Sequence, residues 1–295
     1  MKDLRFLLML SLPALLFSAC LSIGGGISMF DAFDTVVFIA QTAESIQKST
    51  EDLTPENEYY IGRAVAATIF GQYKPYADAR ANAYVNNVGV SLAYQSNRPE
   101  TYGGYHFQIL DSDDINAFAA PGGIILITRG LIQCAQSEDE LAAILAHEVG
   151  HVVLEHGLKT IKQSRQTAAI TDAAVRAGKQ LGGTELREVT NLFGDSIGDV
   201  MKQMVNAGYS REWEKDADHE AVVILKQAGY DPMALVRMLE VMDTRLKPGG
   251  LDFAKTHPDP KDRIRDVKGF IGRYEEPGPA PAAREKRFQS ELRLN

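Results

Sequence analysis

The 295-residue chain is short of positive charge, of cysteine and of long hydrophobic runs. Its 31 lysines and arginines stand against 39 aspartates and glutamates, which gives a formal net charge of -8. Nothing in this balance suggests the clustered basic face of a phosphate-backbone binder, so nucleic acid is not expected as a partner. After residue 20 no apolar run approaches the ~20 residues that a membrane-spanning helix needs. The 45% hydrophobic composition is nevertheless ample for a core.

The N-terminus has the pattern of a bacterial lipoprotein signal. An early pair of basic residues precedes an apolar run from Phe6 to Phe17, and a run of about a dozen residues is typical of a signal-peptide core. The run leads into small residues and Cys20, which resembles a lipobox. Residues 1–19 are therefore predicted to be a signal peptide and Cys20 to carry lipid, with a plain secretory signal as the alternative. Because Leu21 rather than Asp follows, the expected location is the periplasm, anchored to the outer membrane.

The only other cysteine, Cys134, would then lack an intrachain partner. It lies in the apolar stretch GLIQC and is predicted to be a small buried hydrophobic residue without a catalytic role.

Hydrophobic periodicity predicts an α+β fold that is mostly helical and has a small sheet. Helices are expected between Pro55 and Leu92 with a break at Gly71 and Pro75, over 137–156, over 211–228 and after Pro232. Strands are expected at Tyr105–Leu110 and Gly122–Thr128. Residues 20–54 are predicted to be a tether and a first helix, 55–274 the main domain, and 275–295 a flexible C-terminal tail.

The helix over 137–156 has recognisable ends and contains the motif HEVGH. Ser137 with Glu140 three positions later is typical of a capping box, and Gly157 of a helix stop. His147 and His151 are four positions apart and so share one helical face, which suits two nitrogen ligands of one zinc ion. Glu148 can then act as general base on a water in the open coordination position, whose pKa zinc lowers to about 7.

A third ligand must come from another segment. In SREWEKDADHEA, residues 210–221, Glu214 and Asp218 are again four apart on one helical face. Glu214 would complete a His-His-Glu site, and Asp218 would accept a hydrogen bond from a ligand histidine and so fix its tautomer. Spacing alone leaves open four other acidic residues, namely Glu155, Glu212, Asp216 and Glu220. His156 lies on the far side of the motif helix and is expected to be a partly exposed residue at the helix end.

Four blocks in this order resemble the gluzincin endopeptidases of the HtpX and CAAX prenyl protease type. They are NAFAAPGGIILITRGLI from Asn116, HEVGH, SREWEKDAD, and THPDPKDRI from Thr256, and together they cover about 150 residues. The resemblance implies a zincin-like metalloprotease domain with one zinc ion on His147, His151 and Glu214. It also implies that His257 donates a hydrogen bond to the oxyanion of the tetrahedral intermediate. The absence of further hydrophobic spans points to the periplasmic members.

The segment Asn116–Thr128 has a second interpretation as the substrate-binding edge. An edge strand can hold an extended peptide through backbone hydrogen bonds, whatever the side chains. Gly122 and Gly123 would let the substrate backbone approach closely. The predicted substrate-binding residues are therefore Asn116, Ala117, Ala119, Gly122 and Gly123, and a plain core strand is the alternative.

These features together predict a zinc metalloendopeptidase of the bacterial envelope that hydrolyses unfolded or misassembled proteins, with membrane attachment through the N-terminal lipid. The quality-control role follows from the resemblance alone. The alternatives are a periplasmic chaperone or assembly factor that rarely cuts, and a metal-dependent hydrolase of non-peptide amides. The alanine-rich stretch Ala168–Gly208 is a candidate lid over the site.

Overall fold

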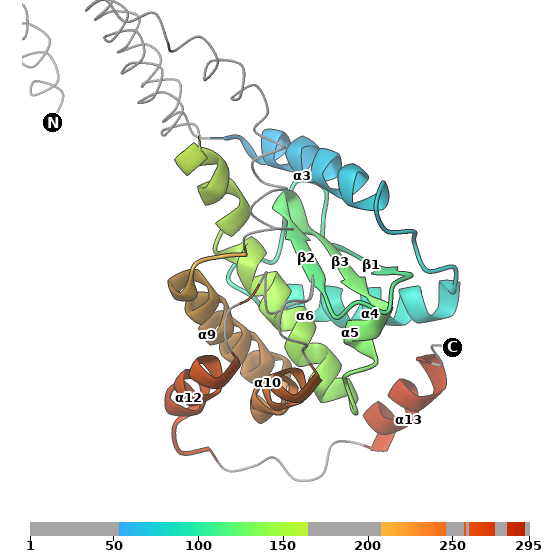
Figure 1. The fold of residues 1–295 in the computed structure, drawn as a ribbon, viewed down its shortest axis with the longest axis vertical. Helices are drawn as coiled ribbons and strands as arrows, with labels where there is room; N and C mark the ends of the chain where they lie inside the picture. Colours follow the sequence, from blue (N-terminus) through green and yellow to red (C-terminus); the bar gives the residue numbers. More distant parts are fainter. Residues whose placement is uncertain (1–52, 165–207, 246–256, 258–259, 275–281, 293–295) are drawn as a thin grey trace, which may run out of the picture.

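A computed structural model of the chain describes residues 53–164, 208–245, 257, 260–274 and 282–292 (Figure 1). The predicted signal peptide, Cys20 and the tether up to residue 52 lie outside these residues, and so does the candidate lid up to residue 207. None of the helices in the described ranges combines the length and hydropathy needed to cross a membrane.

The strands of the domain form one three-stranded sheet within the described residues. Its strands are β1 (His106–Leu110), β2 (Ala117–Ala120) and β3 (Ile124–Thr128), in the order β1-β3-β2. β1 runs parallel to the central strand β3, with His106 opposite Ile124, and β2 pairs antiparallel to it. The predicted strands β1 and β3 are confirmed. β2 was not predicted, because AFAA is four residues long and lacks the polar alternation that marks a half-buried strand.

Helices cover both faces of this sheet (Figure 1). The helices of the described chain that carry labels are, in order, α3 (Pro55–Phe70), α4 (Ala79–Ala93), α5 (Arg129–Ile132), α6 (Glu138–Val153), α9 (Arg211–Ala228), α10 (Met233–Arg245), α12 (Pro260–Ile271) and α13 (Ala282–Glu291), and the first four contact the strands. Alternate residues of β3 serve two cores, since Ile125 and Ile127 pack with α4 and α6 while Leu126 packs with α3. The α+β prediction is thus confirmed, as are the helices over 55–93, 211–228 and 233–245.

α6 lies between the sheet and the helices α9 and α10, and every residue from Glu138 to Val152 is buried. The start is as predicted, because the Ser137 side chain accepts a hydrogen bond from the amide of Glu140. The second half of the capping box differs, since the Glu140 carboxylate accepts from the amide of Gln136 instead. Fifteen buried positions on one helix mean that its polar residues need partners inside the protein.

The predicted end of this helix at residue 156 is wrong. α6 ends at Val153, and Glu155 adopts a left-handed backbone with φ of 56°, after which a new helix starts at His156. Glu155 is the one non-glycine residue with positive φ in the described ranges. Gly157 lies inside the new helix rather than ending the old one, and its missing side chain makes room for the ring of Pro121.

Part of the predicted flexible tail is ordered. α13 packs on α6 and α4, and Arg287 forms an ion pair of 2.6 Å with the buried carboxylate of Glu138 at the first turn of α6. The hydroxyls of Tyr84 and Tyr230 donate to the same carboxylate. The composition of the tail suggested an extension, but its arginines satisfy a buried charge that lies 149 residues earlier in the chain.

Candidate metal centre

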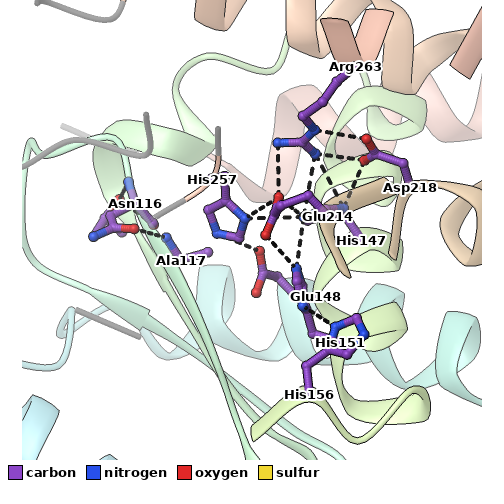
Figure 2. A network of polar contacts seen from close by, with 11 residues as sticks. Asn116, Ala117, His147, Glu148, His151, His156, Glu214, Asp218, His257 and Arg263 are labelled. Atoms are coloured by element: carbon purple, nitrogen blue, oxygen red, sulfur yellow. Dashed lines mark hydrogen bonds and ion pairs between the residues drawn. The ribbon is translucent and has the colours of Figure 1, made fainter. Parts of the chain in front are cut away.

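Two helices that pack against each other place three predicted ligands together. His147 and His151 face α9 from successive turns of α6, and Glu214 faces them from the first turn of α9 (Figure 2). The approach depends on Gly150, because a side chain there would lie 2.9 Å from the carbonyl oxygen of Ala217. The glycine of HEVGH therefore sets how near the glutamate comes to the histidines.

Ring and carboxylate atoms of four residues converge on one point. His147, His151, Glu214 and His257 each offer one ligand atom, and these atoms all lie within 4.8 Å of one another. The Nε2 atom of His151 is 3.1 Å from Nε2 of His147 and 3.4 Å from Oε1 of Glu214. Nδ1 of His257 is 3.3 Å from Nε2 of His147. Four ligands about 2.0–2.1 Å from a tetrahedral zinc ion are roughly 3.3 Å apart, so these separations fit that ion.

The polar atoms of the cluster also fit a cation. Within the described part of the chain, Oε1 of Glu148 and Oε1 of Glu214 are buried and have no hydrogen-bond partner. Burial raises the pKa of Glu148. For Glu214 burial acts the same way, but His257 and the two motif histidines outweigh it and hold its pKa well below the usual value. A charged, buried carboxylate with a free oxygen is the donor that a divalent ion requires.

Asp218 and Arg263 form a second layer behind the histidines. Oδ1 of Asp218 lies 3.0 Å from Nδ1 of His147, which is the contact predicted from spacing. Arg263 binds the same carboxylate with two nitrogens, at 2.6 and 2.8 Å, and its third lies 3.3 Å from Glu214. Burial raises the pKa of Asp218, but Arg263 and His147 outweigh it and lower that pKa to about 2.

Arg263 was missed by the sequence analysis, although it belongs to the block THPDPKDRI. Its signal in the sequence is weak, because an arginine among alternating charges is typical of a solvent-exposed helix face. In the structure it is 7% exposed and extends from α12 between two buried carboxylates. Without this cation, the acidic residues of the site would repel each other at low dielectric.

His257 lies at the metal cluster rather than beside it. Its Nδ1 is 2.8 Å from Oε2 of Glu214, and its Nε2 is 4.0 Å from Oε1 of Glu148. Figure 2 shows its ring between the sheet edge near Ala117 and the carboxylate of Glu214. A nitrogen at this place can serve as a fourth ligand, which spacing alone did not suggest. Its predicted role towards an oxyanion stays a prediction.

His156 differs most from its prediction. It is fully buried rather than partly exposed, and its Nδ1 lies 2.8 Å from Nδ1 of His151. Its ring stacks on Trp213 at 5.0 Å and an angle of 4°. Burial, together with the neighbouring His151 and Lys159, lowers the pKa of His156 to about 2, so this ring is neutral instead of an imidazolium.

The other acidic candidates lie away from the cluster. Glu155 is half-exposed and 3.7 Å from Arg98, while Glu212 and Asp216 are exposed. Glu220 accepts a hydrogen bond from Asn97. Burial and position on the inner face of α9 thus separate Glu214 and Asp218 from acidic neighbours that the sequence could not distinguish from them.

The predicted substrate-binding residues divide into two groups. Ala117 and Ala119 lie in β2, the sheet edge nearest to His257, and Asn116 directly precedes that strand (Figure 2). Gly122 and Gly123 do not have the open face that was predicted. Both adopt positive φ, and a side chain would meet the backbone of Tyr59 at 2.9 Å or of Gly104 at 3.1 Å. These glycines therefore serve packing within the chain.

Comparison with known proteins agrees with this site. The model of peptidase family M48 matches residues 79–271. The beta-barrel assembly-enhancing protease of Escherichia coli (strain K12) is 24% identical over 240 residues, which are 81% of this chain and 47% of that protein. The metalloprotease LoiP of the same strain is 26% identical over 70% of this chain and 73% of its own length. The mitochondrial metalloendopeptidase OMA1 of Schizosaccharomyces pombe is 32% identical over 53% of this chain and 43% of its own.

The chain spans about half the length of the beta-barrel assembly-enhancing proteases that it matches. The family model, in contrast, covers most of the described structure and contains both motif histidines, Glu214 and Arg263. The chain belongs to peptidase family M48.

Proposed function

We propose that the protein is a zinc-dependent endopeptidase of the bacterial cell envelope. The supporting observation is the buried cluster of His147, His151, Glu214 and His257, whose ligand atoms have the mutual separations of one tetrahedral zinc site. The names of the relatives, which are proteases and metalloproteases, agree with this chemistry.

Zinc, when bound, lowers the pKa of water and polarises a carbonyl group. His147, His151 and Glu214 would hold it, and Asp218 would fix the tautomer of His147 by accepting a hydrogen bond from its Nδ1–H. Arg263 would keep Asp218 charged and in place through its two hydrogen bonds.

Glu148 is proposed as the general base. It lies one position after the first ligand, is 1% exposed, and has one carboxylate oxygen without a hydrogen-bond partner in the described part of the chain. Burial raises the pKa of this carboxylate and so brings it closer to the working pH, which suits a group that accepts a proton from the attacking water. The same group would then pass that proton to the leaving amine.

His257 is proposed to stabilise the oxyanion. Its Nδ1 lies among the ligand atoms, so this ring must give up that place before a substrate carbonyl and water can share the site. In the structure its Nε2 lies 4.0 Å from Oε1 of the proposed base Glu148, so a small displacement of the ring would leave an N–H near the reacting group.

The peptide is proposed to bind along β2. The amide of Thr128 donates to the carbonyl of Asn116, so in an antiparallel pair the backbone groups of Ala117 and Ala119 point away from β3. The side-chain oxygen of Asn116 accepts from the amide of Ala117 and holds the beginning of this edge. An extended substrate could add here as a further strand, with little dependence on its sequence.

Unfolded or misassembled envelope proteins are the proposed substrates, and lipid on Cys20 is proposed to hold the protein on the periplasmic side of the outer membrane. The support is the signal pattern of residues 1–20 and the name of the beta-barrel assembly-enhancing protease.

The test combines zinc analysis with cleavage of denatured casein. We expect one zinc per purified chain and cleavage that Glu148→Gln reduces by at least about a hundredfold without loss of zinc. Glu214→Ala should lose the metal. Glu212→Gln, an exposed glutamate on α9, is the matched control and should leave both unchanged.

Full cleavage by Glu148→Gln would contradict the proposed mechanism. If instead the protein bound zinc, cut nothing, and Glu148→Gln still restored envelope assembly in a deletion strain, the chaperone alternative would hold.

A further inference from the structure

We infer that His156 is a positioning residue for the metal ligand His151, because it accepts the hydrogen bond of the Nδ1 proton and so directs Nε2 into the cluster. This inference rests on zinc binding at the proposed site and is independent of peptide-bond cleavage.

The position of His151 fixes which nitrogen bears its proton. Nε2 faces His147 and Glu214, at 3.1 and 3.4 Å, and must be unprotonated to bind a metal ion. The proton of the neutral ring then lies on Nδ1, whose hydrogen-bond partner within the described ranges is Nδ1 of His156 at 2.8 Å. His156 must be the acceptor in this bond, which places its own proton on Nε2.

The break between α6 and the next helix makes this contact. In a continuous helix, residues five apart are about 140° apart in projection, so His156 could not reach His151. The left-handed backbone of Glu155 turns the chain and brings the two rings together. A left-handed backbone is strained for a non-glycine residue, and such strain is concentrated at functional sites.

Two aromatic rings hold the histidine pair, Tyr209 just before α9 and Trp213 in its first turn. His156 is parallel to Trp213 within 4°, and His151 stacks on Tyr209 with centroids 4.6 Å apart. Because Trp213 directly precedes Glu214, the segment that supplies the third ligand also fixes the acceptor ring.

The two histidine ligands thus have different partners. His147 contacts the carboxylate of Asp218, whereas His151 contacts a fully buried imidazole. Loss of such an outer partner commonly weakens metal binding about 10- to 100-fold.

The experiment measures zinc affinity of the purified chain by competition with a chelator. We expect His156→Leu, which fits the space but accepts no hydrogen bond, to weaken zinc binding about 10- to 100-fold. His156→Asn is smaller than histidine but carries an oxygen near the position of Nδ1, so it should recover most of this loss. His106→Leu, the same change at an exposed histidine of β1, is the control that should retain wild-type affinity.

Circular dichroism and thermal unfolding of the metal-free variants show whether each one folds. A folded His156→Leu with wild-type zinc affinity would overturn the inference, and so would a folded His156→Asn as weak as His156→Leu, since packing would then explain the loss. Should His156→Leu not fold, His156→Phe retains a ring against Trp213 and is measured in the same way. A wild-type chain that binds zinc but cuts no peptide would refute the proposed function and leave this inference standing.

Discussion

The substitution Gly150→Ala tests how closely the two ligand-bearing helices must approach. The new Cβ would lie 2.9 Å from the carbonyl oxygen and 3.3 Å from Cα of Ala217. Both are backbone atoms of α9 and cannot rotate away. Since carbon contacts are most favourable at about 3.5–4.0 Å, the helices must separate by roughly half an ångström.

That separation acts directly on the metal centre. Zinc ligands must lie within about 0.2 Å of their ideal distance, and a misplacement of about 1 Å costs on the order of a hundredfold in rate. A displacement of half that size between Glu214 and the two histidines should therefore lower the rate on the order of tenfold. We expect Gly150→Ala to slow casein cleavage by about this factor, and to weaken zinc binding in chelator competition because the ligands no longer lie within the distance tolerance.

The free energy of unfolding of the metal-free variant is a second test, because it should increase if the close contact is unimportant. Alanine is better than glycine in a helix by about 0.8–1.0 kcal/mol, whereas overpacking costs about 1–3 kcal/mol, so metal-free Gly150→Ala should be no more stable than the wild type. Gly269 in α12 is the matched control, because a side chain there would meet nothing within 4 Å. Gly269→Ala should be more stable by about 0.5–1 kcal/mol with unchanged zinc affinity. A Gly150→Ala variant that gains stability like the control and keeps wild-type zinc affinity would refute the reasoning.

Three further substitutions test other contacts. Asp218→Asn keeps the volume but removes the charge facing His147, so chelator competition should show about 10- to 100-fold weaker zinc binding; unchanged affinity would exclude a positioning role. Arg287→Ala removes two hydrogen bonds to the buried Glu138 and should lower the free energy of unfolding in urea by about 1–2 kcal/mol. This value is at the low end for hydrogen bonds to a charged group because the arginine is half-exposed. Glu155→Gly relieves the left-handed backbone and should raise the same quantity by roughly 0.5–1 kcal/mol; a decrease would show that this conformation carries no strain.

Local patterns in the sequence predicted much of the scaffold. Ser137 marked the start of α6 because capping is decided by residues three apart, and the bounds of α9 followed from its own periodicity. The end of α6 could not be predicted from Gly157. The left-handed residue is Glu155, and the helix that follows it packs against distant residues, Pro121 and Trp213.

The candidate site likewise combines features that local spacing predicts with contacts that it cannot predict. The spacing of His147 and His151, and of Glu214 and Asp218, is a property of single helices and is visible in the sequence. The contact of Arg263 with Asp218 joins residues 45 positions apart, and no local pattern distinguishes a buried arginine from an exposed one. The neutral state of His156 likewise follows from burial by other segments.

The ion pair between Arg287 of α13 and Glu138 in the first turn of α6 has a consequence for the order of events during synthesis. Arg287 leaves the ribosome 149 residues after Glu138, and Glu214 emerges between them. HEVGH is therefore synthesised well before Glu214, which would complete the metal cluster. Arg287, the ion-pair partner of the buried Glu138, is synthesised later still. Translation itself keeps the centre unfinished until nearly the whole domain has been made.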